Sequence, residues 1–224
     1  ALLSIVGQIL VRPLPGAANS SSAAYLRLLD PESEMMEFAP TGLTLQQFHE
    51  LREGTPLLAG LASYGNTGQQ VQVGDGRPIR ISAQTIYGDF FEVLGVRPSE
   101  GRLISSEETS LDANPLVAVI SEDLRDRLFG YDGPAVGRIV RMNGQQVEIL
   151  GVAGGGFRGP VRGEARDAWL PRSALVPLVG VPRERLESPT SMLPANLVLL
   201  PRGEIPAEAV QGQVEEALAR LSEA

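Results

Sequence analysis

The chain has 224 residues, of which 43% are hydrophobic and 21% are charged, and its 27 acidic and 19 basic residues give a formal net charge of −8. This size and composition fit a globular protein with one domain or two small ones. The acidic excess argues against nucleic acid and anionic lipid headgroups as partners, because both require a basic protein face. The chain contains no cysteine, which excludes disulfides, thiolate metal sites and cysteine nucleophiles.

An apolar run, residues 1–11 (ALLSIVGQILV), opens the sequence and stops at the Pro/Gly/Ser-rich residues 12–22. No apolar run in the chain approaches the ~20 residues that a membrane helix needs. Residues 1–11 fit an edge strand, the tail of a buried helix, or the outer end of a transmembrane helix, and these three interpretations stay open. Residues 12–22 have the composition of a linker.

Local signals in the first part of the chain predict helix and hairpin boundaries. Thr44 and Gln47 form the pattern of a capping box, which marks a helix start, and leucines at helical spacing follow. Gly54 and Pro56 break this helical segment into two pieces. Alternating valines and isoleucines around Gly74-Asp75-Gly76 predict a hairpin. The predicted elements are a strand at 23–30, a loop at 31–42, a two-piece helix at 44–65, a hairpin at 68–88 and a short helical turn at 87–96.

The second part shows equally clear boundaries. Ser121 predicts the N-cap of a helix that Gly130 closes. Asn143-Gly144 is the strongest short-range signal for a hairpin, and Pro206 near the first turn favours a C-terminal helix with one apolar face. The predicted elements are a strand at 117–120, a helix at 121–130, a hairpin at 137–153, a strand and turn at 167–178, a strand at 196–201 and a helix at 206–224.

The order of these elements predicts a discontinuous α+β fold. A β–α–β–β unit is followed by a second β–α–β–β unit, and a final strand and helix complete the first unit. We therefore expect a second domain that is inserted near residue 101 and left near residue 185.

The segment 154–159 contains a G-x-G-x-x-G pattern, Gly154, Gly156 and Gly159, directly after a predicted strand. A dinucleotide-binding loop needs a helix to start at such glycines, because the helix N-terminus meets the pyrophosphate. Here Gly163 and the lack of an apolar helical face argue against that helix, and the preceding strand belongs to a hairpin. We interpret the glycines as a turn, with Phe157 as its anchor.

The other candidate sites are weak. His49 is the only histidine, and its "HELRE" context lacks the second histidine of a zinc protease motif, so we interpret it as a solvated helix residue. Asn19 fits a glycosylation sequon, a triplet that arises readily by chance. Two acidic clusters fit weak cation binding or a general-acid pair, but solvated loops are favoured. These clusters are Glu107, Glu108 and Asp112, and Glu32, Glu34 and Glu37.

Three ordered motifs resemble the extracytoplasmic core domain of MacB/FtsX-like ABC transporter permeases. The first matches at Phe90, Phe91, Leu94, Gly95, Val96, Pro98, Gly101 and Arg102. The second matches at Val117, Val119, Ser121, Leu124, Phe129, Gly130, Val136, Gly137, Arg138, Asn143, Gly144, Gly151, Val152, Phe157 and Gly159, although many members have tryptophan where Leu124 stands. The third matches at Trp169 and Pro171, and residues 4–16 resemble the end of a first transmembrane helix.

The resemblance implies a porter-like subdomain at residues 1–100 and 186–224, with 1–22 as a membrane-proximal segment. It also implies an inserted, smaller Sabre-like α/β subdomain at 101–185. The motif residues are then packing and turn residues, with no catalytic, cofactor-binding or metal-binding residue to carry over.

The resemblance further implies a periplasmic location on the inner membrane, anchored by flanking helices. The implied partners are an ABC ATPase domain or subunit, a second permease copy, and a periplasmic adaptor or exported substrate. Two rival hypotheses stay open. One is a free-standing extracytoplasmic binding or adhesion module that reuses the fold, and the other is a hydrolase that uses the acidic loops.

Overall fold

The computed structural model of the protein describes residues 4–5, 14–30, 39–40, 42–110, 116–194, 196–205 and 207–223. The strands are β1 (Ser4–Ile5), β2 (Ala24–Asp30), β3 (Ala39–Pro40), β4 (Leu58–Gln72), β5 (Ile79–Gly88), β6 (Pro98–Gly101), β7 (Val117–Ser121), β8 (Ile139–Met142), β9 (Gln145–Ala153), β10 (Ala168–Pro171) and β11 (Asn196–Pro201). The α-helices are α1 (Leu45–Gly54), α2 (Phe90–Leu94), α3 (Glu122–Phe129), α4 (Leu175–Val179), α5 (Arg183–Glu187) and α6 (Ala207–Glu223), with short 3-10 helices η1 (Glu107–Thr109) and η2 (Arg172–Ala174).

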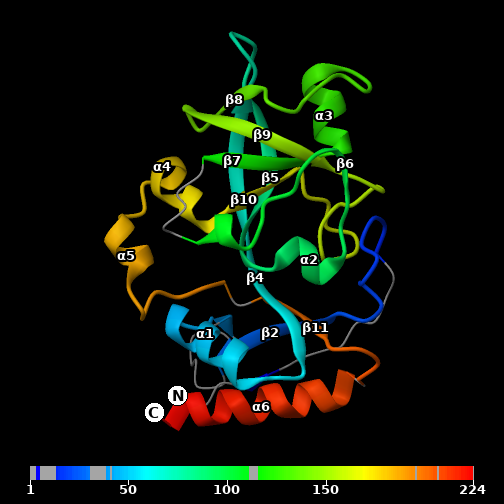
Figure 1. Cartoon of the computed structure of the whole chain (residues 1–224). Coiled ribbons are helices and arrows are strands. Elements are labelled where there is room, and N and C mark those ends of the chain that lie inside the picture. The colour runs from blue at the N-terminus through cyan, green and yellow to red at the C-terminus, as the bar shows by residue number, and fades with distance from the viewer. Residues whose placement is uncertain are drawn as a thin grey trace.

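The strands form one mixed sheet in the order β1-β2-β11-β4-β5-β10-β7-β9-β6. Outside this order, β3 pairs with β2, and β8 pairs with both β4 and β9. The antiparallel pair β4 and β5 is its longest element, running from Ala62↔Gly88 to Val71↔Ile79. Figure 1 shows β4 extending from the end that carries α1 and α6 toward the opposite end, where α3, β8 and β9 lie. Both ends of the molecule are therefore built on the same pair of strands.

Three clusters of buried apolar side chains follow this long axis. At one end, α1 and α6 pack on β2 and β11 through residues such as Phe48, Leu197 and Val214. The middle cluster is rich in aromatic side chains. The third cluster packs α3 and β7 to β10 against the far part of β4 and β5, where Val71 and Ile81 are buried.

Most of the locally encoded predictions are confirmed. The capping box is present at α1, where Gln47 N donates to the Thr44 hydroxyl at 3.1 Å and Thr44 N donates to the Gln47 side chain at 3.0 Å. Ser121 caps α3 by accepting from Leu124 N at 3.1 Å. Asn143 and Gly144 both have positive φ angles, +47° and +86°, at the turn between β8 and β9.

The second half of the predicted two-piece helix is wrong, because residues 58–72 form β4. The leucines at 58 and 61 have helical spacing, but Gly60, Gly65 and Gly68 interrupt the segment, and each glycine costs a helix about 1 kcal/mol relative to alanine. Residues 60–64 are all buried, so this part of β4 is covered on both faces. Such a strand shows no alternation that could distinguish it from a buried helix.

The strand pairing of the sheet bears on the predicted hairpin at 137–153 and on the predicted division into two subdomains. β9 is antiparallel to β8, as the hairpin predicted, but it is also parallel to β7, with α3 between β7 and β8 in the chain. β4 pairs with β8 at Val71↔Met142, and β5 pairs with β10, so strands before residue 101 join strands after it. The division into 1–100 with 186–224 and 101–185 stays a prediction.

The predicted membrane-proximal start is only partly described. Ser4 and Ile5 form β1, which pairs with Leu29 and Leu28 of β2, and residues 6–13 lie outside the described part. Within the described ranges, none of the helices is both long enough and apolar enough to cross a membrane.

Candidate functional site

The three motifs of the sequence meet in an aromatic cluster at the middle of the molecule. All three motifs contribute buried rings: Phe90 and Phe91 from α2, Phe157 from the loop after β9, and Trp169 from β10. The Phe157 and Trp169 rings stack with centroids 5.0 Å apart, and Phe91 meets Trp169 edge-on at 6.0 Å. This geometry supplies packing energy and orientation, and it presents no reactive group.

A polar chain inside the core fixes the orientation of Trp169. Its indole Nε1 donates to Gln84 Oε1 at 3.1 Å, and Gln84 Nε2 donates to Asn66 Oδ1 at 3.1 Å. Gln84 is only 1% exposed, so these bonds satisfy an otherwise costly buried amide. No local pattern identifies Gln84, because its partners lie far away along the chain.

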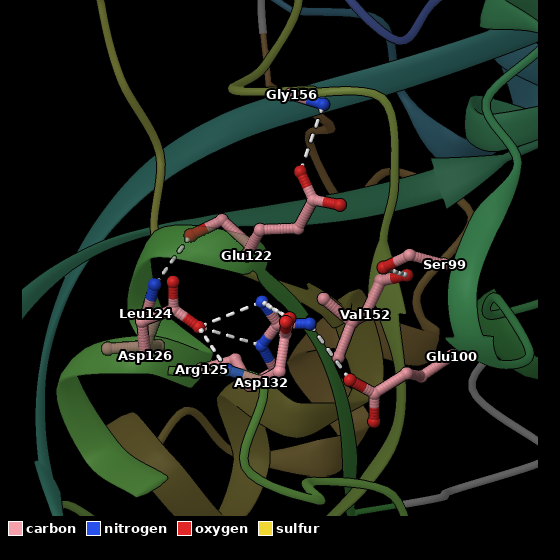
Figure 2. Close-up of polar contacts among 10 residues, drawn as sticks. Ser99, Glu100, Glu122, Leu124, Arg125, Asp126, Asp132, Val152 and Gly156 are labelled. Atoms are coloured by element: carbon pink, nitrogen blue, oxygen red, sulfur yellow. Dashed lines mark hydrogen bonds and ion pairs between the residues drawn. The ribbon is translucent and has the colours of Figure 1, made fainter. Parts of the chain in front are cut away.

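The glycine loop, residues 154–159, leaves β9 as a turn. Its backbone amides are used by the protein itself. Gly154 N donates to Arg97 O at 2.9 Å, and Gly156 N donates to the Glu122 carboxylate at 3.1 Å (Figure 2). After Gly159 the chain runs through turns to β10 without forming a helix. The loop therefore lacks the helix N-terminus of a dinucleotide site, and a carboxylate lies where a phosphate would approach.

The matched glycines occupy positions that favour glycine. Those with positive φ are Gly95, Gly101, Gly130, Gly137, Gly144 and Gly159. Gly101 is the most confined example, since a Cβ atom there would lie 2.2 Å from the carbonyl oxygen of Leu150. This glycine allows β6 to approach β9 closely.

Arg102, which follows Gly101, forms a two-pronged ion pair with Glu108 at 2.7 and 2.8 Å. Its guanidinium lowers the pKa of the Glu108 carboxyl, chiefly through these hydrogen bonds. One member of the predicted acidic cluster is thus paired, while Glu107 is exposed and Asp112 lies outside the described residues. Glu32, Glu34 and Glu37 also lie outside them, and the described part of the chain holds no cluster of three potential metal ligands.

Arg125 on α3 is the buried centre of an ion network with partly exposed carboxylates (Figure 2). Its guanidinium contacts Glu100 at 3.0 Å, Asp126 at 2.8 Å and Asp132 at 2.9 Å, and its side chain is 9% exposed. Burial acts to lower the pKa of Arg125, but the hydrogen bonds to Glu100 and Asp126 outweigh burial and raise it. The network ties β6 to α3 and to the turn after α3.

Arg172 is a second buried arginine, and it has no carboxylate partner among the residues that the structure describes. Its guanidinium donates to Leu186 O at 3.1 Å, Ser191 Oγ at 2.7 Å and Met192 O at 3.2 Å, and burial lowers its pKa. These bonds attach the return segment, residues 186–192, to the end of β10. No sequence pattern distinguishes Arg172 from the other arginines.

The remaining candidate residues have structural contacts. His49 is exposed on α1, as predicted, and its Nε2 lies 3.0 Å from the Tyr87 hydroxyl. The Asn19 amide donates to Glu92 O at 3.2 Å. Pro171 is buried at the end of β10, and Phe90 and Leu94 are buried in α2. Their described contacts are those of packing residues and turns.

The comparisons with known proteins agree with this architecture. The model of the MacB-like periplasmic core domain family matches residues 5–217, so the chain belongs to that family. The resemblance that the three motifs predicted is confirmed. Among individual relatives, the macrolide export ATP-binding/permease proteins MacB of Shigella dysenteriae and Escherichia coli K12 are each 29% identical over 75 residues. That segment is 34% of this chain and 11% of each relative.

Two solved structures share the fold at low sequence identity. The periplasmic region of MacB from Actinobacillus actinomycetemcomitans has a TM-score of 0.69 at 13% identity, covering 93% of this chain and 86% of that one. The extracellular domain of the noncanonic ABC-type transporter YknZ from Gram-positive bacteria has a TM-score of 0.61 at 16% identity. The match covers 83% of this chain and 87% of that one. The predicted α+β fold class is confirmed.

Proposed function

We propose that this domain is the non-catalytic, periplasmic part of an ABC transporter permease, which couples cytoplasmic ATP hydrolysis to work outside the membrane. The single observation that carries the proposal is the family match over residues 5–217. The motif residues support it, because they form an aromatic cluster, glycine turns and ion networks rather than a reactive constellation.

The proposal assigns ATP hydrolysis to a separate cytoplasmic domain or subunit. Two relatives carry "ATP-binding/permease" in their names, and the matched segment is a small fraction of their length. The assigned partners are the ATPase, a second permease copy and a periplasmic adaptor or exported substrate. The domain lies on the periplasmic side of the inner membrane, held by flanking transmembrane helices.

The rival proposal is a free-standing extracytoplasmic binding or adhesion module with the same fold. The two proposals differ in what accompanies this domain. The permease proposal requires membrane spans on both sides of the domain and an ABC ATPase in the same chain or complex. The module proposal requires a cleavable signal peptide and no ATPase.

Purification of the full-length protein from membranes tests the choice. We expect it to require detergent, to contain or retain an ABC ATPase through size-exclusion chromatography, and to hydrolyse ATP. Recovery of a water-soluble protein with a processed N-terminus and no ATPase activity would overturn the permease proposal and support the module.

A further inference from the structure

Residues 14–23, which we call the strap, lie across the end of α2 and the glycine loop. Ala18 N donates to Gly95 O at 3.3 Å, and Asn19 N donates to Leu94 O at 3.0 Å. Ala17 forms an isolated antiparallel bridge with Val96. The strap is thus attached to the C-terminal end of α2 by backbone contacts.

The strap contacts the glycine loop through the backbone atoms of glycines on both sides. Gly16 has a φ of +70°, and a Cβ atom there would lie 2.4 Å from Gly154 O and 2.8 Å from Phe157 N. A Cβ atom on Gly155 would lie 2.8 Å from the Cα atom of Gly16. Only glycines fit on both sides of this contact. The glycine pattern that resembles a nucleotide-binding loop therefore serves as the contact surface of the strap.

The strap buries few large side chains. Its buried residues are Ala17, Ser20 and Ala23, and small residues gain little free energy from burial. Hollows of about 390, 340 and 220 Å³ border it, lined by strap residues together with α2 on one side and the glycine loop on the other. Segments with few buried apolar contacts open at low free energy, so this contact is one of the weaker ones in the fold.

The strap also keeps a compact shape of its own. Ser20 Oγ accepts from Leu14 N at 2.8 Å and donates to Ala17 O at 2.7 Å. Ala17 belongs to the same buried cluster as Phe91 and Phe157, and Leu14 packs against that cluster. Movement of the strap would therefore remove Ala17 and Leu14 from this cluster and change its packing.

We propose that the strap is a releasable contact, docked on the glycine loop in one state of the transporter and detached in another. This inference rests on the proposed function, since the ATPase cycle supplies the force. Detachment frees the glycine loop and uncovers the edge of the aromatic cluster.

Hydrogen exchange of the full-length permease in lipid nanodiscs tests the proposal, with and without ATP and vanadate. We expect the amides of Ala18, Asn19 and Phe157 to exchange at least about tenfold faster in one of the two states. Gly16→Ala, which places a Cβ atom against Gly154 O, should give the faster exchange in both states. Gly74→Ala is the matched control, because Gly74 also has positive φ but nothing lies within 4 Å of its Cβ position.

An engineered disulfide provides the second arm. Ala17 and Val96 face each other across an antiparallel bridge, a spacing of about 5 Å that a disulfide can span. The chain has no cysteine of its own, so Ala17→Cys with Val96→Cys introduces the only pair in this domain. The oxidised pair should abolish the state dependence of exchange in the strap, and reduction should restore it.

The outcomes separate the two proposals. Suppose that the exchange rates of other segments of the domain change with nucleotide, but the strap amides exchange at the same rate in both states, with or without the disulfide. The strap is then a permanent contact, and this inference is overturned. If no segment of the domain responds to nucleotide although the protein hydrolyses ATP, the coupling function itself fails.

Discussion

The indole of Trp169 stacks on the ring of Phe157, with centroids 5.0 Å apart and planes inclined by 29°. This contact joins the glycine loop to β10, and Phe91 adds α2 to the same cluster. Three segments that are distant in the sequence are thereby held at one point. The motif residues therefore serve to hold these segments together, and the contribution of this contact to the free energy of unfolding can be measured.

Truncation of Phe157 should weaken the fold severely. Phe157 is 1% exposed, and replacing a buried phenylalanine by alanine typically costs about 3–5 kcal/mol through lost burial and cavity formation. We expect Phe157→Ala to lose that amount and Phe157→Leu to lose less. Urea unfolding measures the loss, and the fluorescence of Trp169, the only tryptophan, reports on the same contact. Tyr131→Ser, at an 86% exposed position, should change stability by no more than about 0.5 kcal/mol.

Two glycines with similar φ angles should respond differently to alanine. Gly101 and Gly144 have φ angles of +62° and +86°, but only Gly101 faces a backbone atom, Leu150 O, at 2.2 Å from its Cβ position. Gly144→Ala should therefore cost only the backbone strain of about 1–2 kcal/mol. Gly101→Ala should cost clearly more, since β6 must move away from β9. Equal losses in thermal unfolding would contradict this account of the β6–β9 contact.

Removal of the Arg125 charge should leave three carboxylates facing one another. The carboxylate partners keep 28%, 33% and 66% side-chain exposure, so water can solvate them once the arginine is removed. We therefore expect Arg125→Met to lose about 1–3 kcal/mol at neutral pH, less than the loss typical of fully buried pairs. The loss should shrink at high salt, because salt screens the repulsion among the three partly exposed carboxylates. Asp132→Asn removes only the most exposed partner, with 66% side-chain exposure, and should cost less than about 1 kcal/mol. A loss in Arg125→Met that is the same at low and high salt would show that packing, not charge, explains it.

Tyr25 should make the fold sensitive to alkaline pH. Burial raises the pKa of Tyr25 to about 12, and its hydroxyl has no hydrogen-bond partner among the described residues. In the unfolded chain the Tyr25 hydroxyl loses its proton near pH 10, whereas in the folded protein it keeps the proton up to about pH 12. The ionisation of Tyr25 therefore lowers the free energy of unfolding as the pH rises from about 10 to about 12, and it has no effect below pH 10. Tyr25→Phe should match or exceed the parent at pH 7 and lose less stability above pH 10. Stability against pH can be measured for both proteins. Curves that run parallel above pH 10 would contradict the raised pKa of Tyr25.

Features encoded by neighbouring residues could be predicted from the sequence. The capping box of α1, the Ser121 cap and the Asn143-Gly144 turn depend on residues within a few positions of one another. The motif resemblance also identified Phe157 and Trp169 without showing that they touch. Their contact depends on pairing between β5, β10 and β7, which no local pattern encodes.

Buried polar residues and the central strand could not be predicted in the same way. The buried Gln84 is hydrogen-bonded to Trp169, and the buried Arg172 is hydrogen-bonded to the return segment 186–192. Neither partner is a neighbour in the sequence. β4 was mistaken for a helix in its first half because burial on both faces removes the alternation of a strand. The glycine loop resembled a phosphate site by spacing alone, and the composition of the strap that covers it predicted only a linker.

Electron paramagnetic resonance distance measurement on the full-length permease tests the central claim most directly. A spin label attached through Tyr131→Cys lies on an exposed turn of this cysteine-free domain, with other cysteines of the full-length chain replaced. We expect the distance distribution between the labels of two permease copies to differ between the nucleotide-free state and the vanadate-trapped state. An identical distribution in both states, in a preparation that hydrolyses ATP, would contradict the claim that this domain transmits the ATPase cycle.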